Sequence, residues 1–129
     1  MLELKGIHHI AIICSNYEVS KDFYTRILGL KIIRENYRHD RQSFKLDLEL
    51  EGKYIIELFS FPDYVNRPSK PEALGLRHLA FEVEHIEQSI QWLVQNNIEV
   101  EPIREDEFTG KKFTFFTDPD QLPIELYSS

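Results

Sequence analysis

The chain has 129 residues, of which 42% are hydrophobic and 29% are charged, as in an ordinary globular protein that is long enough to bury a core. Its formal net charge of −7 and the lack of a basic run argue against a nucleic-acid partner. No run approaches the roughly 20 apolar residues of a membrane span, the start lacks a signal-peptide pattern, and the single Cys14 excludes an internal disulfide, so we expect a cytoplasmic protein.

The first predicted strand, "GIHHIAIIC" at 6–14, begins with two adjacent histidines, His8 and His9. Neighbouring residues of a strand point to opposite faces, so at most one of the two looks into a given pocket. Ala11 shares a face with His9, and a small side chain there leaves room for a cleft. This alternation favours His9 over His8 for a site role, and we expect His8 to be structural.

A helical pattern, "NYEVSKDFYTRILGL", follows at 16–30. Asn16 is a suitable N-cap and Gly29 a suitable end. The apolar stripe of this helix is expected to consist of Val19, Phe23, Ile27 and Leu30. Two strand-like segments, "SFKLDLELEG" and "KYIIELFSF", then predict a hairpin that turns near Glu51–Lys53.

The second half of the chain repeats the first. After an expected linker at 62–74, which contains three prolines, the strand "GLRHLAFEV" places His78 and Ala80 where the first half has His9 and Ala11. A helix with Ile86, Ile90, Leu93 and Val94 on one face and a hairpin turning at Asp118–Gln121 come next. The sequence thus predicts an α+β fold with two tandem βαβββ modules, 4–61 and 75–129, in one domain spanning 1–129.

The repeat also places one histidine and one glutamate at matching points of each half, namely His9 with Glu57 and His78 with Glu125. Alone, a strand histidine is usually structural and a strand glutamate usually faces solvent. Both glutamates, however, lie between apolar neighbours, where burial without a partner is costly. Two imidazoles and two carboxylates suit a divalent first-row metal if the two sheets face each other. We therefore predict that His9, Glu57, His78 and Glu125 are metal ligands.

Four stretches, "HHIAI…SKDFYTRILGLK", "YIIELFSF", "LRHLAFEV" and "FFTDPDQLPIELY", resemble the vicinal oxygen chelate (VOC) superfamily, and within it glyoxalase I-like (lactoylglutathione lyase-like) proteins. The resemblance implies the glyoxalase/bleomycin resistance/dihydroxybiphenyl dioxygenase fold, in which two tandem βαβββ modules form an incomplete barrel. It implies one divalent ion per site (Ni, Co, Zn or Mn), the same four ligands, and a homodimer that in many members exchanges modules.

The resemblance further implies a metal-dependent lyase or isomerase. Its small substrate would chelate the metal through vicinal oxygens and react by proton abstraction through an enediolate. Glu125 or Glu57 is the implied proton-shuttling base, and the near-symmetry of the repeat offers no choice between them. Ile13 stands where similar bacterial glyoxalase I enzymes have an arginine that contacts glutathione, which weakens the case for a glutathione substrate. Other cations could meet an anionic substrate group, although surface cations are usually solvated: Arg38, Arg41, Arg67, Arg77 and Lys112.

Other functions within the same fold stay open. An extradiol-type dioxygenase would use His9, His78 and Glu125 as a facial triad, and the additional carboxylate of Glu57 counts against it. A transferase acting on an epoxide antibiotic is a further possibility. A non-catalytic small-molecule (antibiotic) binding or resistance protein would have no need of all four ligands. The fold alone does not decide among them.

Overall fold

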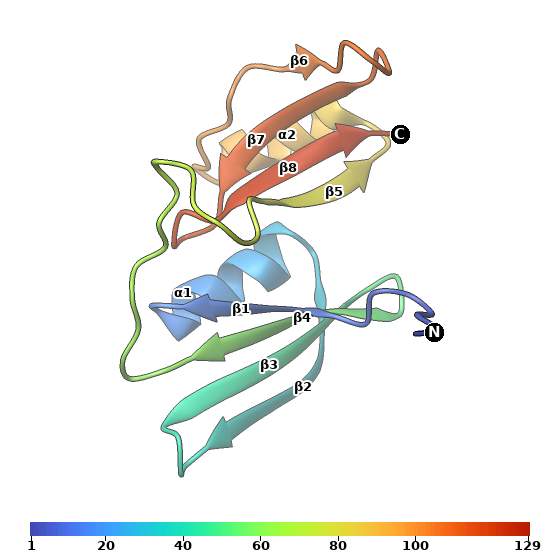
Figure 1. The fold of residues 1–129 in the computed structure, drawn as a ribbon. Coiled ribbons are helices and arrows are strands. Elements are labelled where there is room, and N and C mark those ends of the chain that lie inside the picture. The colour runs from blue at the N-terminus through green and yellow to red at the C-terminus, as the bar shows by residue number, and fades with distance from the viewer. The chain divides into compact units, whose positions relative to one another are not determined.

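The protein consists of two compact units with the same topology. A computed structural model describes all residues, 1–129, which divide into units at 1–65 and 66–129. Each unit contains one open, four-stranded mixed sheet, with strand order β1-β4-β3-β2 in the first and β5-β8-β7-β6 in the second (Figure 1). The predicted fold class, α+β with two tandem βαβββ modules, is confirmed.

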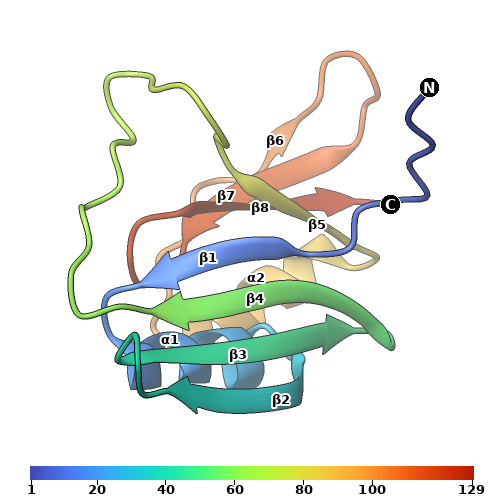
Figure 2. The same cartoon turned by 60° about the horizontal axis from the view of Figure 1, so that its bottom comes forward.

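In the first unit, β1 runs parallel to β4, and β4 and β2 both pair antiparallel with β3. Helix α1 packs against β4 and covers one face of the sheet (Figure 2). The elements are β1 Ile10–Cys14, α1 Tyr17–Asp22, the π-helical turn η1 Phe23–Ile27, β2 Lys31–Arg38, β3 Ser43–Leu50 and β4 Lys53–Ser60.

Helix α1 begins as predicted, because the side chain of Asn16 accepts a hydrogen bond from the Val19 amide at 3.2 Å. The predicted stripe is wrong at Val19, which is half exposed. Val19 lies in the regular α-helical part, off the face that Tyr17, Ser20 and Tyr24 share at helical spacing. After it, the α-helix gives way at Phe23 to a π-helical turn. The Leu28 amide there bonds the Phe23 carbonyl, five residues earlier, at 3.0 Å. The helix side chains that are actually buried are Tyr17, Ser20, Phe23 and Tyr24.

The hairpin between β3 and β4 turns at Glu51 and Gly52, as predicted. Both residues have positive φ, +51° and +77°, which is the combination of a two-residue type I′ turn. The paired strands bury a run of alternate apolar side chains on the helix-covered face: Leu46, Leu48, Ile56 and Leu58. Because side chains alternate along a strand, Asp47 and Glu57 point to the opposite face of this sheet.

The second unit repeats this arrangement with shorter strands, and α2 covers one face of its sheet (Figure 1). The elements are β5 Leu79–Val83, α2 Ile86–Gln95, β6 Arg104–Glu105, β7 Lys112–Thr117 and β8 Pro123–Ser128. Ile86 and Leu93 of α2 are buried as predicted, but Val94 is 57% exposed and lies outside the packed stripe. The hairpin turns at the predicted residues, where the Asp118 carboxylate accepts hydrogen bonds from the amides of Asp120 and Leu122. None of the helices is long and apolar enough to cross a membrane.

Candidate metal centre

The two glutamates predicted as ligands occupy the same position in their sheets. Glu57 on β4 lies opposite Ala11 of the parallel strand β1, and Glu125 on β8 lies opposite Ala80 of the parallel strand β5. The small alanine beside each carboxylate leaves space on that face of the sheet. The repeat read from the sequence is therefore also a repeat in strand register.

Each glutamate has the predicted histidine as its neighbour. His9 Nε2 lies 3.8 Å from Glu57 Oε1, and His78 Nε2 lies 3.5 Å from Glu125 Oε1. Both glutamate side chains are 15% exposed, and the histidines are 34% and 30% exposed. Each unit thus presents one imidazole and one carboxylate, with nearly the same exposure to solvent in the two units.

The prediction that His8 and His9 point to opposite faces is wrong. Both residues precede β1, which begins at Ile10, so strand alternation does not govern them. Their Nδ1 atoms lie 2.8 Å apart, and both rings are about 5 Å from the ring of Tyr54. His8 is therefore a direct neighbour of the candidate ligand His9.

In the first unit, a network of charged and polar side chains surrounds Glu57. Lys45 Nζ lies 3.4 Å from Glu57 Oε2 and 2.8 Å from Asp47 Oδ1. The Tyr54 hydroxyl lies 2.6 Å from Asp47 Oδ1 and 3.1 Å from Glu57 Oε2. Its single proton is shared between two carboxylates, so Tyr54 and Lys45 together hold Glu57 in place.

The electrostatics of this network centre on Asp47, whose side chain is fully buried. Burial alone would raise the pKa of Asp47, but hydrogen bonds from Lys45 and Tyr54 outweigh it and hold the pKa below its ordinary value. Burial and the hydrogen bond to Asp47 raise the pKa of the Tyr54 hydroxyl well above its usual range. Tyr54 therefore stays a hydrogen-bond donor across the physiological pH range.

Sequence reasoning missed Lys45, Asp47 and Tyr54. In a regular strand, Tyr54 would share the helix-covered face with Ile56, away from Glu57. The register shift between Leu48 and Glu49 inserts an extra residue on β4, so that Tyr54 reaches the face of Glu57. The alternation of Lys45 and Asp47 with apolar residues on β3 was visible, but that pattern usually marks a solvent-facing side.

The second unit surrounds its glutamate differently. At the position of Asp47 it has Phe115, which lies opposite Glu125, and at the position of Lys45 it has Phe113. The Phe115 ring contacts His78 edge to face at 5.1 Å between centroids. Glu125 accepts no hydrogen bond, and His78 is its ion-pair partner. Its carboxylate is thus mostly buried without the cation and hydroxyl that hold Glu57.

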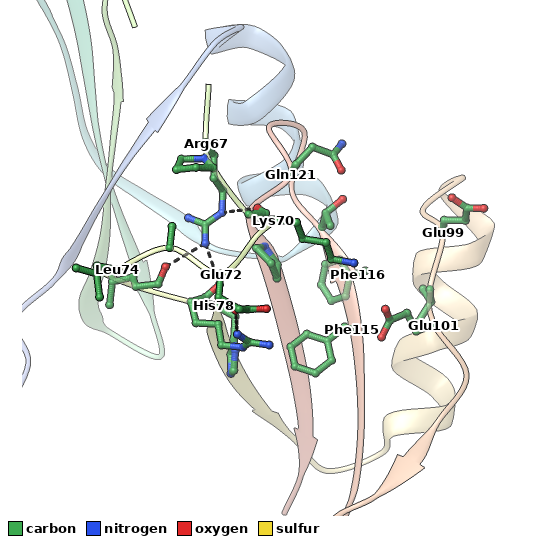
Figure 3. Close-up of a pocket in the computed structure, with 18 of the residues that line it drawn as sticks. Arg67, Lys70, Glu72, Leu74, His78, Glu99, Glu101, Phe115, Phe116 and Gln121 are labelled. Carbon is green, nitrogen blue, oxygen red and sulfur yellow. Dashed lines mark hydrogen bonds and ion pairs between the residues drawn. The ribbon is translucent and has the colours of Figure 1, made fainter. Parts of the chain in front are cut away.

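A pocket of about 1360 Å³ opens beside His78, within the second unit (Figure 3). Phe115 and Phe116 form part of its wall, and the guanidinium of Arg104 lies over the rings of Phe113 and Phe115 at 5.0 and 5.7 Å. The volume exceeds the roughly 300–1,000 Å³ typical of small-molecule sites. The space beside His78 is therefore sufficient for a small metabolite.

Neither unit alone brings together three or more histidine, cysteine, aspartate or glutamate side chains suited to a metal ion. Each contributes two ligands of the predicted set, one nitrogen and one oxygen donor. The combined set of two imidazoles and two carboxylates is one that divalent first-row metals accept. The mostly buried Glu125 carboxylate, which has no hydrogen bond, is the kind of group that a cation would compensate.

Comparisons with known proteins agree on one protein family. The model of the Glyoxalase/Bleomycin resistance protein/Dioxygenase superfamily matches residues 6–126. The uncharacterized protein YwkD of Bacillus subtilis (strain 168) is 62% identical over 96% of this chain and 97% of its own length. Metallothiol transferase FosB of Staphylococcus saprophyticus is 28% identical over 97% of this chain and 78% of its own length.

Solved structures agree with the sequence comparisons. The crystal structure of a glyoxalase family protein from Enterococcus faecalis is 54% identical, with a TM-score of 0.88, and covers 95% of this chain and 97% of that protein. The similarity therefore extends over nearly the whole of both chains.

Proposed function

Because the chain belongs to the Glyoxalase/Bleomycin resistance protein/Dioxygenase superfamily, we propose that it is a metal-dependent enzyme acting on a small molecule with vicinal oxygens. The proposed reaction is that of a glyoxalase I-like lyase or isomerase, which removes a proton from a carbon next to a carbonyl group. The proposed ligands of a single divalent ion are His9, Glu57, His78 and Glu125.

The observation that carries this proposal is the matched pair of His–Glu contacts at the same strand register in both units. A protein site for a divalent transition metal generally has three or more protein ligands, and each unit offers two. We therefore propose that both pairs bind the same ion, whether they come from one chain or from two chains of a homodimer. A purely structural role for the four side chains would not require their equivalent placement.

The surroundings of the two glutamates favour different roles for them. An ion bound to this set would act as a Lewis acid on the vicinal oxygens of the substrate. Lys45 and Tyr54 hold Glu57, which favours a fixed ligand. Glu125, with no hydrogen bond to restrain it, is the carboxylate that is free to turn toward the substrate and accept its proton. We therefore assign the base to Glu125 and the anchoring ligand to Glu57.

A second candidate function is the transfer of a thiol to a small electrophile such as an epoxide. The similarity to the metallothiol transferase FosB over nearly the whole chain favours it. It would use the same metal ligands but would not need a base that takes a proton from carbon. Replacement of Glu125 by glutamine separates the two, since it would abolish proton abstraction and spare much of a thiol transfer.

The test is metal analysis of the purified protein and of Glu57→Gln, Glu125→Gln and Glu49→Gln variants. Turnover is measured on methylglyoxal–thiol adducts and on an epoxide with a thiol. The loss of a residue that merely supports a ligand typically lowers metal affinity by about 10- to 100-fold. We expect Glu57→Gln, at a direct ligand, to lower it by at least as much. Glu125→Gln should keep the metal better but lose at least 100-fold in turnover of the adduct. The matched control is Glu49→Gln, because Glu49 lies on β3, which pairs with the strand of Glu57, and has no polar partner.

Two results would overturn these assignments. Wild-type protein that binds no divalent ion, even after reconstitution, would remove the proposed site. Protein that binds metal through these ligands but turns over no adduct would leave the site and remove the lyase function. Turnover of the epoxide alone would select thiol transfer.

A further inference from the structure

Seven charged side chains line the pocket beside His78. Its cations outnumber its carboxylates, with four side chains against three. The cations are Arg67, Lys70, Arg77 and Arg104, and the carboxylates are Glu72, Glu99 and Glu101. An excess of cations in a concave site favours anionic ligands, provided that the cations are not already neutralised.

Two of these cations are neutralised within the pocket wall. Arg77 pairs with Glu72, and Arg104 Nη2 lies 3.1 Å from Glu101 Oε2. Glu99 forms no ion pair, and it lies with Glu101 on the side of the pocket away from Arg67 (Figure 3). The cations of the pocket that remain without an ion pair are therefore Arg67 and Lys70.

Arg67 is held in place without a carboxylate partner. Its Nη2 donates to the backbone carbonyls of Leu76 and Arg77 at 3.0 and 2.9 Å, and its Nε donates to Ser69 Oγ at 3.1 Å. These bonds fix the guanidinium against the two residues that precede His78, while Nη1 keeps its N–H groups unused. A guanidinium with an ordered plane and free donors is prepared to bind an oxyanion at little entropic cost.

Lys70 provides the second cation. It forms neither an ion pair nor a hydrogen bond, and it extends from the linker into the pocket (Figure 3). Lys70 and Arg67 are three residues apart and line the same pocket as His78. An anion bound between them would lie in the pocket that the candidate metal ligand also lines.

We propose that the substrate carries an anionic group, a phosphate ester or a carboxylate, which Lys70 and Arg67 bind while its vicinal oxygens lie at His78. This inference rests on the proposed function and names the substrate class for the same site.

The test compares ligands that share a hydroxyketone and differ in charge. Dihydroxyacetone is neutral, dihydroxyacetone phosphate carries a phosphate ester, and hydroxypyruvate carries a carboxylate. Affinities for the metal-loaded protein are measured by calorimetry at low and high salt. We expect at least one anionic ligand to bind 10-fold or more tightly than dihydroxyacetone, with an advantage that shrinks as salt screens the contact.

Variants then locate the contact. Lys70→Ala should lower the affinity for the anionic ligand by about 3- to 10-fold and leave dihydroxyacetone binding unchanged. Arg67→Ala should act in the same direction, and because Lys70 makes no bond within the fold, Lys70→Ala keeps the test valid if Arg67→Ala is unstable. The matched control is Lys111→Ala, since Lys111 is exposed in the same unit and does not line the pocket.

The outcomes separate this inference from the proposed function. Equal affinity for charged and neutral ligands in metal-loaded protein, or equal losses in Lys70→Ala and Lys111→Ala, would overturn the anion site and leave the metal site intact. Protein that binds no metal would overturn the proposed function. The anion site is then decided by inorganic phosphate: amide NMR shifts at Arg67, Ser69 and residue 70 that Lys70→Ala abolishes would support it, and no shifts would overturn it.

Discussion

Replacing Asp47 by alanine removes the buried carboxylate on which Lys45 and Tyr54 converge. These two side chains also contact Glu57, so the change loosens the support of a proposed metal ligand without touching the ligand itself. We expect the free energy of unfolding of the metal-free protein to fall by about 3 kcal/mol, because a buried carboxylate with short, charge-assisted hydrogen bonds is replaced by a small cavity.

The magnitude follows from the three partners of Asp47. Lys45 at 2.8 Å and Tyr54 at 2.6 Å donate hydrogen bonds that are each worth about 1.5–3 kcal/mol. Arg34, at 3.3 Å, is 62% exposed and adds less than about 1 kcal/mol. The expected loss of stability is smaller than the sum of these three contributions, because Lys45 and Tyr54 both keep Glu57 as a partner in the variant. A loss of about 3 kcal/mol corresponds to about 10 °C in melting temperature for a chain of this size.

The loss of stability in Asp47→Ala should depend on pH. The hydrogen bonds hold the pKa of Asp47 in the folded protein below its ordinary value. A carboxyl whose pKa is lowered by folding stabilises the protein above its unfolded pKa of about 3.9, and this stabilisation is lost as the pH falls through the folded pKa. The gap in stability between wild type and Asp47→Ala should therefore be full at pH 7 and narrow below about pH 4.

Urea unfolding followed by circular dichroism, at pH values from 7 to 3, measures this difference. Glu49→Ala is the control, because Glu49 is a carboxylate on the same strand that has no polar partner. It should change the unfolding free energy by less than about 0.5 kcal/mol. If Asp47→Ala lost no more stability at pH 7 than Glu49→Ala, the network would not be holding Glu57 as described.

Two further predictions concern local structure. Asn16→Ala removes the hydrogen bond to the Val19 amide and should cost about 1 kcal/mol, seen as a lower melting temperature, whereas Asn16→Asp should restore most of it. Gly52→Ala places a β-carbon at φ +77° in the hairpin turn and should cost about 1 kcal/mol or more in urea unfolding. An unchanged urea midpoint for Gly52→Ala would contradict the type I′ turn.

The parts of the fold that the sequence predicted correctly are those with local causes. The hairpin at Glu51–Gly52 and the turn at Asp118 depend on turn residues, and the N-cap depends on Asn16. The helical stripes were less reliable. The predicted stripe was placed on Val19, whereas the buried face of the helix is the one that Tyr17, Ser20 and Tyr24 share.

Some residues of the candidate site were likewise predictable from the sequence, and others were not. The equivalent placement of Glu57 and Glu125 was predictable, because a repeat in sequence preserves strand register. The histidines lie just before β1 and β5, and their contacts with the glutamates follow from the same repeat. Tyr54 was not predictable, because its place beside Glu57 depends on a bulge. The comparison of the two halves also considered only the residues that they share, and so it did not include the positions at which they differ, such as Asp47 and Phe115.

Those differences carry the functional argument, because a perfectly symmetric pair of halves would give both glutamates the same chemistry. At equivalent positions, the first sheet has Asp47 where the second has Phe115. The carboxylate of Asp47 orders Lys45 and Tyr54, which in turn restrain Glu57, while the ring of Phe115 contacts His78 and gives Glu125 no hydrogen bond. A ligand needs restraint and a base needs freedom to move. The two halves share one backbone plan, and their side chains support the assignment of the ligand role to one glutamate and the base role to the other.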